Sequence, residues 1–146
     1  GPPRSGPAPL WTERRLVMLL VDSCMYIQWL RNKEYPEQVL KSWLLTCDVA
    51  TCGLIRLEVL RGVTVPALHA RLTRLFDVLV EVPLASGLLH KAAEMAWKLD
   101  RSGKVLSLPD LIIAQCALDR DATLVSLDEH FRHIPGLKWS RTLPAR

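Results

Sequence analysis

The sequence predicts an α/β fold, a three-layer sandwich in which helices flank a central parallel sheet. Short apolar runs that suit buried strands alternate along the chain with longer segments of helical periodicity. The first run, residues 16–21, is apolar without alternation, as in a strand that is buried on both faces of a parallel sheet. Strands that alternate with helices pair in parallel because each helix carries the chain back across the sheet. We therefore expect a parallel sheet and not an antiparallel one.

Helices and strands of the first half follow from apolar spacing and from capping residues. Thr51 is a suitable N-cap, and Gly62 is a suitable stop for the helix that follows it. Glu58 would lie within the last two turns of that helix. In chain order we expect helices at residues 25–31 and 37–45, a strand at residues 45–49, and a helix at residues 51–61.

The second half repeats the alternation with clearer boundary signals. Pro66 suits the first position of a helix, and Gly103 suits the residue that closes one. Pro135 and Gly136 would end the last helical turn. In chain order we expect a helix at residues 66–76, a strand at 78–82, a helix at 86–101, a helix that starts at 107 and ends before 121, a strand at 123–125 and a helical turn from 126.

Length and composition indicate one globular domain, residues 16–146, behind a leader. Residues 1–15 hold a Pro- and Gly-rich stretch that is expected to be a disordered leader or a tag remnant, and Met18 is a candidate natural start. A net charge of +4 suits a polyanionic partner, although an ordinary basic surface would give the same value. No segment has the roughly 20 apolar residues of a membrane helix.

The cysteines do not form a recognisable metal or disulfide pattern. Cys24, Cys47, Cys52 and Cys116 show no C-x-x-C pair and no matching histidine spacing. Cys24 and Cys116 lie in apolar runs, so we expect them to be small core residues. Reduced thiols of this kind are typical of a cytoplasmic protein.

Four acidic residues occupy positions that the fold would bring together. Asp22 and Asp128 follow strands, and Glu58 and Asp110 lie in helices. Two carboxylates 4 Å apart repel each other by roughly 4 kcal/mol at an effective dielectric constant of 20. Such a group requires protons or a divalent cation, and hard oxygen ligands favour Mg²⁺ or Mn²⁺. The pattern predicts a metal-dependent phosphodiesterase with all of these acids as metal ligands and catalytic residues.

Each acid also has a structural interpretation that spacing alone leaves open. Asp22 could form a turn after its strand, although its apolar neighbours argue against a solvated turn. Asp110 stands three residues after Ser107, which is the spacing of a capping box. Glu58 could pair with Arg61 on an exposed helix face, although most of its neighbours are apolar.

For Asp128 the same reasoning works by elimination. If Ser126 and Glu129 form the cap of the last helical turn, Asp128 is left to face the crevice at the end of the strand. His130 and His133 follow on that turn, and we expect them to be surface residues or RNA contacts more than ligands.

Four blocks of sequence, in order, resemble the PIN-domain family, and especially the VapC-type toxins of bacterial toxin–antitoxin pairs. The blocks are VDSCMYIQWL, IRLEVLRG, LSLPDLIIAQCAL and TLVSLDEHFRHIPGL, which cover about residues 18–137. Each block is weak alone, whereas their order and the presence of every acid make the resemblance specific. Two features depart from the family pattern, namely Cys24-Met25 after the first acid and the proline-rich leader.

The resemblance implies both a site and an activity. It places the metal-binding acids at Asp22, Glu58, Asp110 and Asp128 and a supporting hydroxyl at Ser126, and we add Ser23 as a second supporting residue. It implies a PIN-like sandwich and an endoribonuclease that uses Mg²⁺ or Mn²⁺ to activate water. Attack by water and not by the ribose 2′-hydroxyl would leave 5′-phosphate and 3′-hydroxyl ends.

The resemblance also implies partners. The partners are an RNA substrate, a cognate antitoxin that occludes the site, and a second copy of the chain in a homodimer. Promoter DNA would be bound only through the antitoxin complex. The implied location is the cytoplasm of a prokaryote. Trp29, Trp43 and Leu44 would be antitoxin or dimer contacts unless they are core residues. Basic side chains at the rim would position RNA, for instance Arg56, Arg61 and Lys104.

Other classes fit less well. A haloacid-dehalogenase-like phosphatase needs a second aspartate two residues after the first, and that position is Cys24. A receiver domain needs a lysine after its late strand, and Ser126-Leu127-Asp128 supplies none. A catalytically silent PIN-like module that binds RNA or an antitoxin remains the alternative from a different class.

Overall fold

The computed structural model describes residues 17–46 and 48–145, so the expected leader and Cys47 lie outside the described residues. Within these residues a single sheet runs through the molecule with strand order β3-β2-β1-β4-β5, and every pairing is parallel. The strands are β1 (Leu19–Val21), β2 (Val49–Cys52), β3 (Val80–Val82), β4 (Thr123–Val125) and β5 (Lys138–Ser140). The predicted α/β fold with a central parallel sheet is confirmed.

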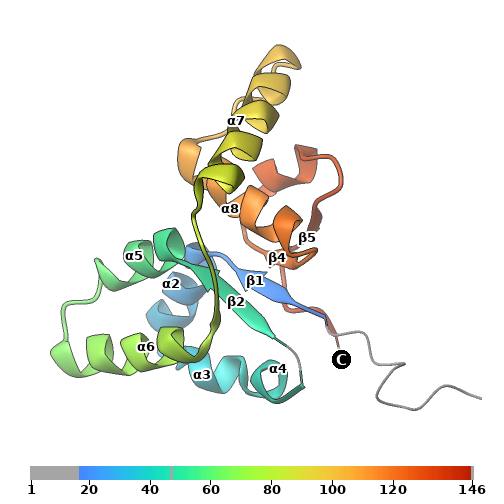
Figure 1. The fold of residues 1–146 in the computed structure, drawn as a ribbon. Coiled ribbons are helices and arrows are strands. Elements are labelled where there is room, and N and C mark those ends of the chain that lie inside the picture. Colours follow the sequence, from blue (N-terminus) through green and yellow to red (C-terminus); the bar gives the residue numbers. More distant parts are fainter. Residues whose placement is uncertain (1–16, 47, 146) are drawn as a thin grey trace, which may run out of the picture.

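Helices cover both faces of the sheet. In Figure 1, α7 (Ser86–Arg101) and α8 (Leu108–Asp119) lie on one side, and the helices of the first half lie on the other. These are α2 (Ser23–Arg31), α3 (Pro36–Val39), α4 (Lys41–Thr46), α5 (Gly53–Leu60) and α6 (Pro66–Val78). A short 3-10 helix, η1 (Glu129–His133), connects β4 to β5. No helix in the described part of the chain is long and apolar enough to cross a lipid bilayer.

Strand β1 is the centre of the structure. Leu19, Leu20 and Val21 are fully buried, as expected for a strand that is covered on both faces. Leu19 pairs with Val49 on one side and with Thr123 on the other. Each buried Leu or Val side chain stabilises the fold by about 1.5–3 kcal/mol. The carboxyl ends of β1 and β4 are thereby fixed side by side, which positions the residues that follow each strand.

The second strand starts later than the sequence indicated. The expected strand at residues 45–49 overlaps β2 only at Val49, and Thr51 lies inside the strand instead of capping a helix. Thr51 is fully buried and pairs with Glu81 of β3 in the parallel sheet. Strand pairing therefore determines the conformation of a residue that the local sequence pattern had assigned to a helix cap. The following helix starts at Gly53, with Cys52 as its N-cap.

Other differences concern boundaries and one short edge strand. The helix expected at residues 37–45 is divided at Leu40, which ends α3 before α4 begins. The strand expected at residues 78–82 begins at Val80, because α6 continues through Val78. Strand β5 was not predicted, since three residues at a sheet edge carry too little periodicity to be detected.

The two tryptophans considered as partner contacts belong to the core. Trp29 is 7% exposed and Trp43 is 6% exposed, so neither is available to an antitoxin or a second copy. Trp29 packs edge-on against Tyr26, with ring centroids 5.5 Å apart. Leu44 is only partly buried against the same core. The core interpretation therefore holds for both tryptophans.

Tyr26→Phe should raise stability, which is unusual for a core substitution. The Tyr26 ring is fully buried against Trp29 and Phe76, and its hydroxyl has no hydrogen-bond partner within the described residues. A buried, unpaired polar group costs roughly 1–3 kcal/mol, so removing it should raise the free energy of unfolding by about 1 kcal/mol. Thermal and urea unfolding measure the change. Tyr35→Phe, at an exposed ring, is the control; a loss of stability in Tyr26→Phe would mean that the hydroxyl is satisfied.

Candidate functional site

A pocket of about 340 Å³ opens at the carboxyl edge of the sheet. All of the acids singled out in the sequence reach it. Its lining residues are Asp22, Ser23, Cys24, Glu58, Asp110, Ile113, Leu127 and Asp128. Larger pockets exist elsewhere on the surface, but this one gathers the carboxylates.

Asp22 is the most firmly held of these acids. It follows β1, caps α2 and is 5% exposed. Its Oδ1 accepts a hydrogen bond from the Ser23 backbone N–H at 2.8 Å, and its Oδ2 accepts one from the Ser126 hydroxyl at 2.7 Å. Its own backbone N–H donates to the Val125 carbonyl at 2.9 Å, which ties the end of β1 to the end of β4. The carboxylate is therefore fixed in one orientation from both of its oxygens.

Glu58 approaches Asp22 from α5. The Ser23 hydroxyl donates to Glu58 Oε1 at 3.4 Å and so lies between the two acids. Burial raises the pKa of Glu58 above its ordinary value, and the charge of Asp22 raises it further. Among the described residues, Glu58 does not form the solvent-facing ion pair with Arg61 that the spacing allowed, and it lines the pocket instead.

The sequence left open whether Asp110 belongs to a helix cap or to the acidic site, and the structure shows Ser107 in the cap and the Asp110 side chain in the pocket. Ser107 caps α8, and its hydroxyl accepts from the Asp110 backbone N–H at 3.3 Å. The Asp110 side chain nevertheless lines the pocket. Burial raises the pKa of Asp110 to about 6, with the nearby charge of Asp128 as the next cause. Capping by the serine thus leaves the carboxylate free for the pocket.

Asp128 reaches the pocket by a different local structure from the one expected. Asp128 itself caps η1, and its Oδ1 accepts from the His130 backbone N–H at 2.9 Å. The Ser126 and Glu129 capping pair is therefore wrong, and Glu129 pairs with Arg141 on the surface at 2.6 Å. An aspartate with good Asx-turn geometry is a better cap here than a serine that is already bonded to Asp22.

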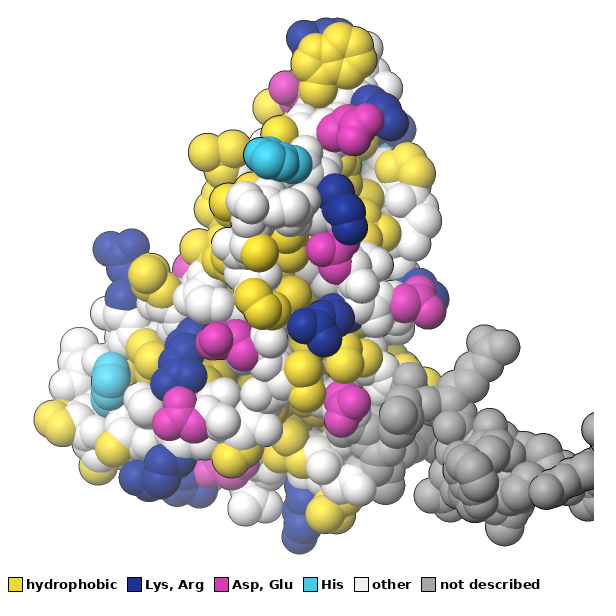
Figure 2. Space-filling view, viewed as in Figure 1, with side chains coloured by type: hydrophobic (Ala, Val, Ile, Leu, Met, Phe, Trp, Pro, Cys, Tyr) yellow, Lys and Arg dark blue, Asp and Glu magenta, His cyan; other side chains and the backbone are white. Residues whose placement is uncertain are grey.

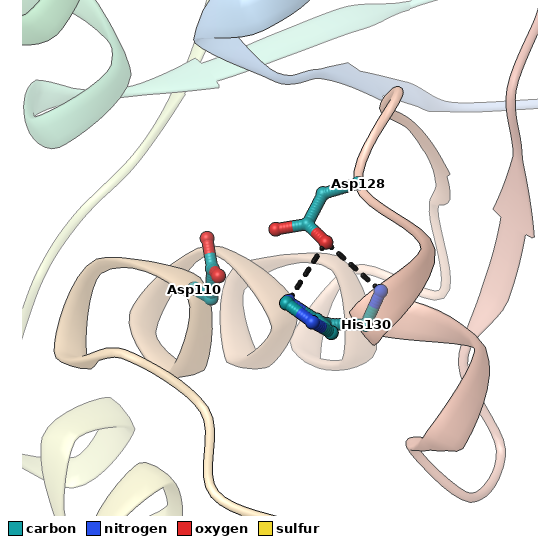
Figure 3. Close-up of side chains that lie close together, drawn as sticks. All are labelled: Asp110, Asp128 and His130. Carbon is teal, nitrogen blue, oxygen red and sulfur yellow. Dashed lines mark hydrogen bonds and ion pairs between the residues drawn. The ribbon is translucent and has the colours of Figure 1, made fainter.

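His130 is a surface residue, as expected, but its side chain contacts Asp128, one of the pocket acids. Its Nδ1 lies 3.0 Å from Asp128 Oδ1. Figure 3 shows Asp110, Asp128 and His130 together, with one Asp128 oxygen directed at His130. One ligand atom from each of these three side chains lies within 4.8 Å of the others. The available signal was the spacing, because an Asp that caps a helix brings the residue two positions later next to its own side chain.

Ser126 and Cys24 connect the two halves of the pocket. Ser126 is fully buried; its hydroxyl donates to Asp22 and accepts from the Asp128 backbone N–H at 3.1 Å. Cys24 is not the core residue that was expected, because its thiol donates to Asp22 Oδ2 at 3.6 Å and accepts from the Leu127 N–H at 3.4 Å. Burial and the charge of Asp22 raise the pKa of this thiol. Cys116, by contrast, is a buried core residue as predicted.

The expected rim cations are not equivalent. Arg56 pairs with Asp77 at 2.5 Å and lies over the Phe76 ring. Lys104 lines a separate pocket between α7 and η1. Arg61 is exposed one residue past the end of α5, the helix that carries Arg56 and Glu58.

The donor set suits a hard divalent cation. Four carboxylates and the Ser23 hydroxyl supply oxygen atoms to the pocket, and the pKa values of Glu58 and Asp110 are raised first by burial and then by the charge of a neighbouring carboxylate. The acids form two pairs, Asp22 with Glu58 and Asp110 with Asp128. The charge of Asp22 raises the pKa of Glu58, and the charge of Asp128 raises the pKa of Asp110. Such a pocket can hold one or two divalent ions beside a phosphate group.

Comparisons with known proteins agree with this geometry. The family model described as the PIN domain matches residues 19–137. A comparison with curated proteins finds no match. Among solved structures, the chain is similar to VapBC2 from Rickettsia felis bound to a DNA fragment from the promoter, with TM-score 0.71, 18% identity, and coverage of 85% of this chain and 98% of that chain.

Two further structures show the same fold. DNA-bound VapBC from Salmonella typhimurium matches with TM-score 0.70 and 19% identity over 85% of this chain and 97% of that chain. A toxin–antitoxin complex from Klebsiella pneumoniae matches with TM-score 0.64 and 20% identity over 82% of this chain and 94% of that chain. At these identities the likeness concerns the fold.

Proposed function

Because the chain belongs to the PIN-domain family, we propose that it is an endoribonuclease that depends on Mg²⁺ or Mn²⁺ and serves as the toxin of a toxin–antitoxin pair. The observation that carries the proposal is the convergence of Asp22, Glu58, Asp110 and Asp128 on one pocket. PIN domains are generally nucleases, and the solved neighbours include VapBC and other toxin–antitoxin complexes.

The chemistry follows from the charges of the pocket. Asp22, Glu58, Asp110 and Asp128 would hold a divalent ion, which would lower the pKa of a water molecule and neutralise charge on the phosphate and on the leaving 3′ oxygen. Hydrogen bonds to both carboxylate oxygens fix the orientation of Asp22. The Ser126 hydroxyl bonds to Asp22 and to the Asp128 backbone N–H, and so fixes the position of Asp128 relative to Asp22. Because water attacks and the 2′-hydroxyl does not take part, the products should carry 5′-phosphate and 3′-hydroxyl ends; cyclic phosphate ends would contradict this route.

A groove next to the acids suits an antitoxin segment. One pocket of about 390 Å³ between α2 and the segment before α6 shares Glu58 with the acid pocket, and it continues into a second pocket of about 470 Å³ through Leu30, Val65 and Leu68. A peptide with apolar residues along the groove would reach Glu58 with a basic side chain. Such a peptide would neutralise the carboxylates and exclude RNA.

The remaining parts of the proposal concern assembly and location. We propose a homodimer, supported by exposed apolar residues on and after α7: Leu89, Trp97, Val105 and Leu108. Figure 2 shows hydrophobic side chains on the surface of the arm that α7 forms. Promoter DNA would be bound through the antitoxin complex: VapBC2 from Rickettsia felis is bound to a DNA fragment from the promoter, and VapBC from Salmonella typhimurium is bound to DNA. The RNA substrate would be met in the cytoplasm of a prokaryotic cell.

Cleavage of a mixed cellular RNA pool tests the proposal. The native protein should make discrete cuts with Mg²⁺ or Mn²⁺ and none with chelator. Asp110→Asn should lower the rate by at least about a hundredfold, because it removes one charged ligand from the pocket. Sequencing of the fragment ends would identify the target and the end chemistry.

The matched control is Asp100→Asn, an exposed aspartate on α7 away from the pocket. It should cut like the native protein, which excludes a contaminating nuclease and a general charge effect. Equal cleavage by native protein and Asp110→Asn, or none with any metal, would instead favour a catalytically silent PIN-like module that binds RNA or an antitoxin.

A further inference from the structure

The imidazole of His130 stands beside a pair of carboxylates. His130 Nδ1 is 3.0 Å from Asp128 Oδ1, and ligand atoms of Asp110, Asp128 and His130 all lie within 4.8 Å of one another (Figure 3). We propose that His130 is a nitrogen ligand to the ion held by Asp110 and Asp128, and that it makes this site prefer Mn²⁺ to Mg²⁺. The inference rests on the proposed metal-dependent function and adds a ligand to it.

The separation between the two donor atoms suits a shared ion. In an octahedron with bonds of about 2.1 Å, adjacent ligand atoms are about 3.0 Å apart and opposite ones about 4.2 Å apart. His130 Nδ1 and Asp128 Oδ1 form an ion pair at 3.0 Å, and a bound ion would replace this direct contact while the two atoms keep the spacing of adjacent ligands. The ligand atoms of Asp110, Asp128 and His130 lie within 4.8 Å of one another, so a small inward movement of the side chains would bring all three to the distances of a shared ion.

The local fold keeps His130 at this place. Asp128 caps η1 and accepts the His130 backbone N–H at 2.9 Å, so residue 130 cannot move away from the carboxylate without loss of the cap. The neighbouring Phe131 side chain is fully buried and anchors the same turn. The His130 side chain is 73% exposed, and its ring faces the Asp128 carboxylate through Nδ1.

The chemistry of the donors decides the preference. Mg²⁺ is a hard ion that strongly favours oxygen ligands and retains water. An imidazole nitrogen contributes more to the binding of first-row transition ions such as Mn²⁺ than to the binding of Mg²⁺, because the transition ions are softer. A site of two carboxylates and one imidazole should therefore gain affinity for Mn²⁺ with little gain for Mg²⁺.

His133 provides a matched comparison. It lies on the same 3-10 helix and is also exposed, but it lines the pocket between α7 and η1 with Lys104 and Ile134. It is therefore a histidine of similar exposure and chain position that does not face the acids.

The test is direct spectroscopic detection of nitrogen bound to Mn²⁺. Electron spin echo modulation on the full chain loaded with Mn²⁺ alone should show a ¹⁴N signal in native protein and in His133→Gln, and no such signal in His130→Gln. Calorimetric titrations should show that His130→Gln loses about tenfold in Mn²⁺ affinity and less than about threefold in Mg²⁺ affinity. Thermal unfolding checks that both variants are folded.

Three results would overturn the inference while leaving the proposed function intact: bound Mn²⁺ without a nitrogen signal in native protein, a signal that persists in His130→Gln, or an equal loss of affinity for both ions. Absence of any bound Mn²⁺ or Mg²⁺ would remove the inference and the metal-dependent function together. The two kinds of failure are therefore distinguishable.

Discussion

Asp22→Asn should reduce metal-dependent RNA cleavage by at least about a thousandfold, equivalent to roughly 4 kcal/mol of transition-state stabilisation. Asp22 is the most buried of the acids, and both of its oxygens accept hydrogen bonds, from the Ser23 N–H and from the Ser126 hydroxyl. An asparagine must present its NH₂ group to one of these donors. The substitution therefore removes a charge and also breaks the contact that orients the side chain.

Rates of cleavage and calorimetric metal binding measure the effect of Asp22→Asn. Metal affinity should fall together with the rate, since a ligand is lost. Asp100→Asn again serves as the control, because it makes the same chemical change on an exposed part of α7. A rate within about threefold of native, at saturating metal, would show that Asp22 has only a structural capping role.

Without metal, the free energy of unfolding should fall as pH rises from about 4 to 7, which is opposite to the usual trend for carboxylates. Asp110 has its pKa raised from 3.8 to about 6, and the pKa of Glu58 is raised as well. A group with a raised folded-state pKa contributes stability that is complete below its unfolded pKa and is lost as pH passes the folded pKa. Allowing for solvent screening of these half-exposed groups, the loss should be roughly 1–2 kcal/mol.

Unfolding by urea at about pH 4.5 and about pH 7.5, in chelator and in saturating Mn²⁺, tests this linkage. At a hundred times its dissociation constant, the ion should restore about 2.7 kcal/mol at the higher pH. Asp110→Asn should show a flatter pH profile than native protein in chelator, because the titrating group is gone. Parallel profiles for the two proteins would mean that Asp110 does not titrate in this range.

Much of the fold was predictable because its strongest signals are local. The bounds of α7 and β4 agree with the expected ranges, since helix α7 has a long amphipathic period and β4 a compact apolar run. The shift of β2 was not predictable from local pattern. Thr51 is equally suited to a cap and to a strand, and only its pairing with Glu81 in the ladder decides between them.

The candidate site was predictable in its acids and not in its connections. The order of strands and helices indicates that the residues after β1 and β4 meet, which brings Asp22 and Asp128 together. The contact between Cys24 and Ser126 depends on side-chain directions in segments more than a hundred residues apart. Such contacts leave no periodic trace in the sequence, so they follow only from the assembled structure.

The insertion of β4 beside β1 has a consequence for biosynthesis. The centre of the sheet pairs Leu19 with Thr123, and the pocket needs Asp128 next to Asp110. A nascent chain that has not yet released the segment around residue 128 from the ribosome lacks the pairing of β1 with β4 and lacks Asp128, one of the four carboxylates. The pocket therefore assembles only after the segment with β4 and Asp128 has been made and has joined β1, so any activity of the pocket begins after that step.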